Sequence, residues 1–374
     1  MEMKRHLLTL SVLAALILSV SCTKEKTSDK VPDGPEAPSV PEVEWTDVND
    51  FIARSETQTV VQPEGTFMRG YWPDGKLIPV KKGNTWQLFW GEATDALTNA
   101  STPYPEDHIA SLTDDSKVWG KEFSQIDGFN DGGSWFIGIF PLDGDGHYAG
   151  FFHAESHWPG DGIAYKSIGA VYSDDFGVSW HDPMQIIVDE TAKPEAPEWS
   201  GLGDGCVIRD SVNARYICYY QAKSTIGLNN LCMAASSDSR GAPGTWKKWD
   251  GKDFTIEARD PETGLGGKNV AIANLRRVAG ANPSVMWNDF LSKWVIVYAG
   301  WDKCVYMSFS DDGIAWEIPQ KILGDDAPAW YPNLIGPDGD LAGGEYVKLY
   351  WSHNQDSQGR RDIAYCWIKF KKKI

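Results

Sequence analysis

A short pattern of serine, aspartate, glycine and tryptophan recurs three times along the chain and constrains its fold more than any other feature. The copies are Ser173–Trp180, then Ser236–Trp246, which carries an insertion, and Ser310–Trp316, which lacks one spacer residue. Each copy follows a short apolar stretch that is typical of a β-strand. A pattern that returns at wide spacing indicates an architecture built by repeating one small β-unit.

The chemistry of the repeated residues predicts a tight turn between two strands. A Ser or Asp side chain accepts hydrogen bonds from backbone N–H groups two residues on, and Gly supplies the left-handed backbone of the turn. The Trp then covers the turn and packs between neighbouring sheets. We therefore expect the three copies to stabilise the fold and to lie away from the reacting groups.

Between the repeats the chain reads as strand, turn and strand, with almost no helical periodicity. This pattern predicts an all-β protein of five strand groups, closed by an early strand near Thr59–Phe67 that pairs with the last group. Radial repetition of this type leaves only short sheet edges. The expected strands are Lys76–Val80 and Thr85–Gly91; Trp135–Pro141, Tyr148–His153 and Ser167–Tyr172; Gly205–Arg209, Tyr216–Gln221 and Leu231–Ala235; Pro283–Trp287, Trp294–Ala299 and Val305–Phe309; Asn333–Ile335, Tyr346–Ser352 and Asp362–Phe370.

Five such units with these turns resemble the five-bladed β-propeller glycosidases, the superfamily of arabinanases, invertases and levansucrases. Ser173–Trp180 matches the Asp-box of glycosidase propellers at every defining position. The resemblance covers about residues 58–370 and implies a five-bladed β-propeller with Asp-box hairpins, to which we assign residues 58–374. Asp-boxes also occur in six-bladed sialidases and in non-enzymatic propellers, so they indicate a fold and leave the function open.

The first 21 residues read as a lipoprotein signal peptide. Lys4 and Arg5 form a basic start, and Leu7–Val20 is an apolar run too short to span a bilayer. A small residue before Cys22 resembles a bacterial lipoprotein cleavage box, although Ser19 stands where that box usually has Leu. We expect the mature chain to start at a lipid-bearing Cys22; an ordinary secretory signal is the alternative.

Residues 22–57 read as the lipidated cysteine and a flexible tether. The segment is polar and cannot bury enough apolar surface to fold. Its composition is marked by Pro32, Pro35, Pro38 and Pro41. Together the anchor and tether predict a monomer held at the outer membrane or cell surface of a bacterium, with the lipid as its only membrane contact.

The net charge limits the classes of binding partner, and the cysteine spacing indicates the state of the thiols. A formal charge of −17, from 35 basic and 52 acidic side chains, argues against nucleic acid and anionic lipid and says little about neutral sugars. The remaining cysteines show no CxxC spacing, so we expect buried thiols, with a disulfide between Cys206 and Cys218 as the alternative. No cofactor is expected, and the sequence leaves open whether the protein binds a structural calcium ion.

Three aspartates stand at equivalent places, at the starts of expected innermost strands. They are Asp74, Asp131 and Asp204, and Asn282 holds the same place in the fourth group. In the resembling family the innermost strands start at the pocket, which implies that Asp74 is the base, Asp131 an orienting acid and Asp204 the general acid. The family usually has Glu at the third place, and Asp before Gly is also a common turn pair.

His153, Glu155 and His157 form the densest group of polar side chains expected on the same face. Alternate residues of an extended chain point the same way. Glu155 between two imidazoles can act as a general acid or base, with its pKa set by its neighbours. Two His and one Glu can also hold a metal, but the spacing is not that of HExxH, so we assign no metal. A purely structural cluster is the third reading.

Loops on this face supply further candidates for binding sugar. Trp158, in a Gly- and Pro-rich loop, is the best stacking platform, although packing between blades is the alternative for any single Trp. The remaining substrate-binding candidates, besides His153, His157 and Asn282, are Glu92, Asp95, Trp301 and His353.

These residues predict a surface-tethered glycoside hydrolase that acts on an extracellular poly- or oligosaccharide, with Asp74 and either Asp204 or Glu155 as the working pair. Hydrolysis needs two carboxyls about 5 Å apart for retention or roughly 6.5–9.5 Å apart for inversion. A non-catalytic glycan-binding propeller is the alternative, in which Arg or Lys neutralises the carboxylates. A sialidase is the third reading, but arginines are few, and an acidic protein repels an anionic sugar.

Overall fold

The computed structural model describes residues 40–56, 59–60, 74–83, 85–90, 100–104, 118–119, 124–324, 329–337, 339–355 and 361–372. Val40–Ile374 forms one compact unit. The predicted signal peptide, Cys22, Glu92 and Asp95 lie outside the described residues. No helix within them is long and apolar enough to cross a membrane.

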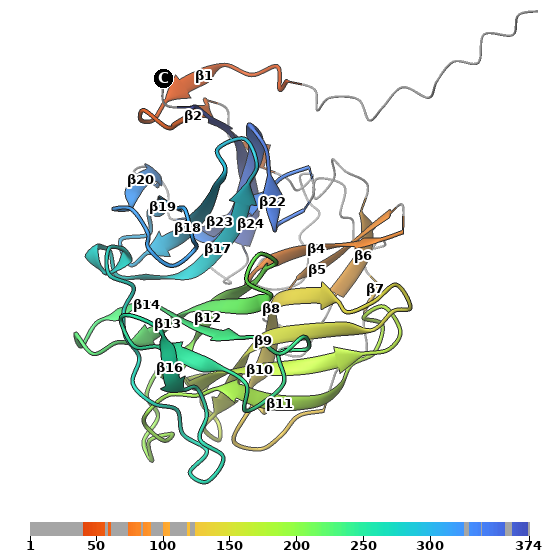
Figure 1. Cartoon of the computed structure of the whole chain (residues 1–374), viewed down its shortest axis with the longest axis vertical. Coiled ribbons are helices and arrows are strands. Elements are labelled where there is room, and N and C mark those ends of the chain that lie inside the picture. Colours follow the sequence, from red (N-terminus) through yellow and green to blue (C-terminus); the bar gives the residue numbers. More distant parts are fainter. Residues whose placement is uncertain are drawn as a thin grey trace, which may run out of the picture. The chain divides into compact units, whose positions relative to one another are not determined.

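The fold is all-β, as predicted, and its strands form four hydrogen-bonded sheets (Figure 1). The largest sheet consists of two antiparallel groups joined by a short parallel pair, so there are five antiparallel groups of described strands in all. One 3-10 turn, Leu275–Arg277, is the single helical element of the described part. The first two groups are β4 (Leu77–Lys82), β5 (Thr85–Trp90), β6 (Ala100–Tyr104) and β7 (Val118–Trp119), then β8 (Gly133–Pro141), β9 (Tyr148–His157), β10 (Ala164–Ser173) and β11 (His181–Ile187). The third is β12 (Ser200–Asp210), β13 (Arg215–Lys223), β14 (Asn229–Ser236), β15 (Lys247–Trp249) and β16 (Phe254–Glu257).

The last two groups complete the chain. They are β17 (Gly280–Asn288), β18 (Lys293–Gly300), β19 (Val305–Ser310) and β20 (Gln320–Leu323), with β22 (Ala342–Gly343) parallel to β17, then β21 (Trp330–Ile335), β23 (Tyr346–Gln355) and β24 (Arg361–Phe370). Each strand predicted for the five groups is present with shifted ends, whereas the strands β6, β7, β11, β15, β16, β20 and β22 were not predicted. A parallel bridge at Lys166 and Gly201 joins the second and third groups.

The folded unit begins earlier than the sequence suggested. β1 (Trp45–Asp47) and β2 (Ile52–Ser55) lie within the stretch predicted as tether, and β2 pairs with β24. Ile52 is fully buried in a cluster that contains Phe370. The boundary at residue 58 is therefore corrected to Val40, because one short apolar segment suffices to cover the edge of β24. The expected closing strand is present in part, as β3 (Thr59–Val60) pairs with β24, and the rest of Thr59–Phe67 lies outside the described residues.

The innermost strands of the five groups contact one another in the order β4, β8, β12, β17 and β21. The backbone N–H of Leu77 in β4 donates to Oδ1 of Asn333 in β21 at 3.1 Å, which joins the first group to the last. Beside this contact, Nζ of Lys76 lies 2.8 Å from Oδ2 of Asp340, and both side chains are almost completely buried. A buried ion pair is costly to break because the remaining charge loses its partner.

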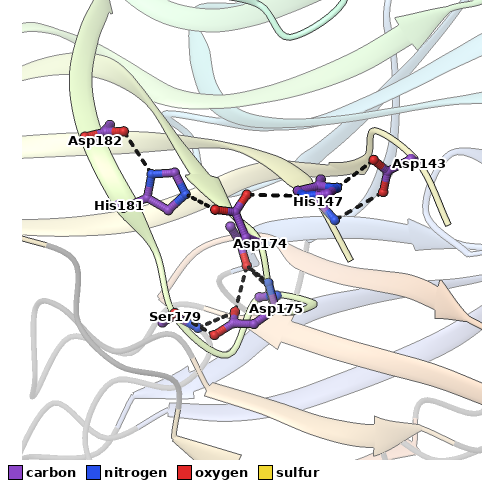
Figure 2. Close-up of polar contacts among 9 residues, drawn as sticks. Asp143, His147, Asp174, Asp175, Ser179, His181 and Asp182 are labelled. Atoms are coloured by element: carbon purple, nitrogen blue, oxygen red, sulfur yellow. Dashed lines mark hydrogen bonds and ion pairs between the residues drawn. The ribbon is translucent and has the colours of Figure 1, made fainter. Parts of the chain in front are cut away.

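The three repeated turns have the hydrogen bonds expected of them. In the first, Ser173 Oγ accepts from the N–H of Gly177 at 2.8 Å, and Asp175 accepts from the N–H and Oγ of Ser179 at 2.8 and 2.6 Å (Figure 2). Trp180, which ends this turn, is buried and packs against Phe89 of the neighbouring group. The tryptophans that end the other two turns are buried as well. The repeats thus stabilise corners between strands.

All five described cysteines are free and buried, which confirms the prediction of buried thiols. The alternative disulfide between Cys206 and Cys218 is not formed. Burial raises the pKa of the Cys206, Cys232 and Cys366 thiols to about 12, so these groups stay protonated.

Candidate functional site

A small cavity of about 60 Å³ opens where the innermost strands start. Asp74, Glu155 and Asp204, three of the four predicted catalytic residues, line this cavity, together with His153 and Asn282. They come from the segment before β4 and from β9, β12 and β17. Residues far apart in sequence therefore meet at one place.

Several side chains of the cavity are oriented by the same backbone feature, a positive φ at a β-bulge. Asp204, Asn282 and Tyr331 have φ values of 46°, 54° and 50°, in the left-handed region that non-glycine residues seldom adopt. Each lies at an interruption of the pairing between its strand and the next. Such bulges turn a side chain out of the regular alternation. All three residues line the cavity, so the strain is concentrated at the candidate site.

His153 is held in one tautomer by the backbone of β12. A Cβ at Gly203 would lie 2.1 Å from Nδ1 of His153, so the ring can occupy this place only beside a glycine. The N–H of Asp204 donates to this Nδ1 at 2.9 Å. Because a backbone N–H only donates, Nδ1 carries no proton, and the N–H of the ring is at Nε2, 3.1 Å from Oε1 of Glu155.

Glu155 accepts hydrogen bonds from two imidazoles. Its Oε2 lies 3.0 Å from Nε2 of His157, opposite the contact with His153. Burial raises the pKa of Glu155, but the two imidazole hydrogen bonds and the charge of Lys166 outweigh it and bring the pKa to about 2. The hydrogen bond to Glu155 in turn raises the pKa of His157. Glu155 is thus a carboxylate, and it favours the protonated form of the His157 imidazole beside it.

This histidine cluster is not arranged as a metal centre. Within the residues that the structure describes, no group of three or more His, Cys, Asp or Glu side chains is placed to hold a metal ion. Both oxygens of Glu155 already accept hydrogen bonds from the histidines.

Asp204 is ion-paired, which corrects its predicted role as general acid. Nζ of Lys166 lies 2.7 Å from Oδ2 of Asp204, and the amide of Asn282 donates to Oδ1 at 3.4 Å. Burial raises the pKa of Asp204, but the Lys166 charge and the hydrogen bonds overcome this effect and bring the pKa to about 2. A carboxyl with that pKa has no proton to give at neutral pH.

Lys166 and Tyr331 were missed by the sequence reasoning. Lys166 is the cross-strand partner of Glu155 in the β9–β10 pair, so the register of that hairpin was the signal that could have found it. The Tyr331 hydroxyl donates to Oδ1 of Asp74 at 2.9 Å. Tyr331 precedes a proline just as Asn282 does, and this shared place at the strand start was the second available signal.

Asp131 and Trp158 do not face the cavity. Oδ1 of Asp131 is buried without a hydrogen-bond partner among the described residues, and the charge of Asp131 contributes to the raised pKa of His157. Trp158 is 9% exposed, its Nε1–H donates to the carbonyl of Pro194 at 3.1 Å, and Nζ of Lys193 lies 4.5 Å from its ring centre. The prediction of Trp158 as a stacking platform is therefore wrong, because its ring is covered.

The remaining candidates are distributed as follows. Trp301 is 46% exposed and lines a second, neighbouring groove. His157 lies behind Glu155 and does not line the cavity itself. His353 lies in β23, but its side chain is outside the described residues.

No family model matches the sequence, and no curated protein matches it. Among solved structures, the chain is similar to a family 117 glycoside hydrolase of the marine bacterium Zobellia galactanivorans, with 13% identity, 83% of this chain and 90% of that chain covered, and a TM-score of 0.47. An α-L-arabinofuranosidase from Podospora anserina is 11% identical to this chain, with 84% of this chain and 95% of that chain covered and a TM-score of 0.48. An N-acetylgalactosamine deacetylase from F. plautii is 12% identical, with 81% of this chain and 94% of that chain covered and a TM-score of 0.46. At these identities the likeness concerns the fold alone.

Proposed function

We propose that this protein is a glycoside hydrolase on a five-bladed β-propeller, in which each antiparallel strand group is one blade. The observation that carries the proposal is the meeting of Asp74, Glu155 and Asp204 at one cavity. Paired carboxyls across such a cavity are what glycosidic hydrolysis requires.

The proposed roles follow from the partners of each carboxylate. Asp74, oriented by the Tyr331 hydroxyl, accepts the proton of the attacking water. Glu155 and His157 share one proton, and this pair donates it to the oxygen of the leaving sugar. Asp204, fixed by Lys166, supplies a permanent negative charge beside the oxocarbenium-like transition state.

The cavity favours a neutral sugar. No arginine is among the described residues that line it, whereas an anionic sugar calls for bidentate arginine contacts. The net charge of −17 also disfavours an anionic ligand. We further propose that the substrate is an extracellular saccharide and that a lipid on Cys22 holds the protein at the surface. Incorporation of labelled palmitate into the wild type, and not into Cys22→Ala, is the test of the anchor.

The hydrolase proposal is tested with p-nitrophenyl glycosides of neutral pentoses and hexoses in both anomeric forms, together with neutral plant and algal polysaccharides. On any substrate that is cleaved, Asp74→Asn and Glu155→Gln should each lower kcat by about 10²–10⁴-fold. Asp311→Asn removes a carboxylate that is 85% exposed, in the third repeated turn, and should leave kcat unchanged. Wild-type rates in both cavity variants would sink the assignment.

A non-catalytic glycan-binding protein is the second candidate. It is favoured by one observation, the ion pair between Asp204 and Lys166, which neutralises a carboxylate of the cavity. Binding of a polysaccharide in affinity electrophoresis, without reducing ends appearing on prolonged incubation, would select this candidate over the hydrolase.

A further inference from the structure

A second and larger groove adjoins the cavity. Its volume is about 1100 Å³ against about 60 Å³ for the cavity, so it is the roomier of the two. Its lining comes from residues 189–199 before β12, from the start of β12, from the connection between β13 and β14, and from Trp301.

Groove and cavity are separated by single side chains. Lys166 and Gln221 line the groove, and Nζ of Lys166 contacts Gln221 Oε1 at 3.2 Å and Asp204 Oδ2 at 2.7 Å. Asp204 lines the cavity. The contacts of Lys166 therefore join the lining of the groove to the lining of the cavity.

The groove presents two exposed indoles. Trp199 is 57% exposed and Trp301 is 46% exposed, whereas Trp90, Trp246 and Trp351 are completely buried. Trp301 is fixed by a contact of its Nε1 with the carbonyl of Asn229 at 3.4 Å and by packing on Trp330, with ring centres 5.9 Å apart. Large aromatic surfaces of this kind, left open to water in one groove, suit the apolar faces of sugar rings.

The polar lining also fits hydroxyl-rich ligands. Both signs of charge are present, because Lys166, Lys223, Glu190 and Glu198 all line the groove. Such mixed walls offer hydrogen-bond donors and acceptors to hydroxyl groups and favour neither a polyanion nor a polycation.

We propose that this groove binds the continuation of a saccharide chain whose reacting sugar occupies the cavity, with Trp199 and Trp301 as stacking platforms. The inference rests on the proposed carbohydrate function of the cavity and adds that the ligand is an oligosaccharide of several units. Short glycosides reach only the cavity, and longer ones gain the contacts of the groove.

The test compares neutral oligosaccharides of two to six units, prepared from whichever polysaccharide the wild type binds or cleaves, with a p-nitrophenyl monoglycoside. Trp199→Ala and Trp301→Ala should each lower kcat/KM or the association constant for the hexasaccharide about tenfold. Both variants should retain the wild-type value for the monoglycoside. Ile318→Ala, which removes an exposed apolar side chain outside the groove, is the control.

The outcomes separate this inference from the proposed function. The proposed role of the groove would be rejected if the wild type and the variants had equal kcat/KM or association constants for the hexasaccharide. It would also be rejected if the variants lost equally on short and long ligands. Neither result would affect the proposed role of the cavity. Selective loss of hexasaccharide binding without any turnover would support the groove and reject the hydrolase. Absence of all saccharide binding by the wild type would reject both.

Discussion

At the scale of single residues, Lys166 decides the charge state of the cavity. Its ammonium pairs with Asp204 and adds to the field that keeps Glu155 ionised. Neither carboxyl that was considered as a general acid therefore holds a proton by itself. The acid of the proposed reaction is therefore a pair, in which Glu155 favours the protonated form of His157.

Lys166→Met tests this dependence. Without the ammonium, burial is opposed only by the weaker effects of Asn282 and His153, so the pKa of Asp204 rises from about 2. The acidic limb of the profile of kcat/KM against pH should move to higher pH. Lys252→Met, which removes an exposed lysine of a surface loop, should leave the profile in place, and a wild-type profile in both variants would contradict the role of Lys166.

Glu155 makes a prediction about stability. Its folded-state pKa is depressed, so its contribution is present above the ordinary pKa and is lost as the pH falls toward about 2. A shift of this size corresponds to about 3 kcal/mol. Between pH 5 and pH 2 the free energy of unfolding of the wild type should fall by about 3 kcal/mol more than that of Glu155→Gln. Urea unfolding monitored by tryptophan fluorescence measures both, and parallel curves would contradict the expectation.

At the scale of elements, two kinds of irregularity have different tasks. The repeated turns stabilise corners between strands, while the bulges at Asp204, Asn282 and Tyr331 aim side chains into the cavity. In the third turn, Asp312 accepts from the N–H groups of Ile314 and Ala315, both at 2.8 Å. Its neighbour Asp311 is 85% exposed and contacts Lys293.

This neighbouring pair gives a matched test of the turn. Asp312→Ala leaves two backbone donors without their partner and should lower the free energy of unfolding by about 1–2 kcal/mol. Asp311→Ala should change it by less than about 0.5 kcal/mol. Thermal unfolding of the two variants measures this difference. Equal losses of unfolding free energy would mean that Asp312 does not stabilise the turn more than its exposed neighbour does.

The strands also show which parts of the fold could be predicted from the sequence. Alternating and apolar runs located the inner strands, because the burial that shapes those runs is strong there. Short outer strands such as β15 and β16 escaped, since few of their residues are buried. The carboxylates at strand starts were recognised from turn chemistry, but their partners depend on register and on positive φ at residues such as Tyr331, which the sequence does not encode locally.

At the scale of the whole molecule, the two ends of the folded chain share one sheet. β2 pairs with β24 through Ile52, Ala53 and Arg54, so the N-terminal strand covers the edge that the C-terminal strand would otherwise expose. Covering an edge both buries apolar surface and removes a site for pairing with another chain.

Two truncated chains test this closure. A chain that starts at residue 58 loses β1 and β2, including the fully buried Ile52, and should lose at least about 1.5–3 kcal/mol of stability. A chain that starts at Val40 keeps both strands and should unfold at the temperature of the longer protein. Identical melting temperatures would contradict the extended boundary and restore residues 22–57 as a tether.

The buried thiols have a consequence under oxidising conditions, such as those that the proposed export of the protein implies. Extracellular space is oxidising, and a thiol reacts there in its thiolate form when it is accessible. Cys206, Cys232 and Cys366 meet neither condition while the chain is folded, because burial raises each pKa to about 12. Once unfolded in air, the same thiols are free to cross-link at random. Because packing protects the thiols only in the folded chain, unfolding under oxidising conditions should be irreversible, and a reducing agent should restore refolding.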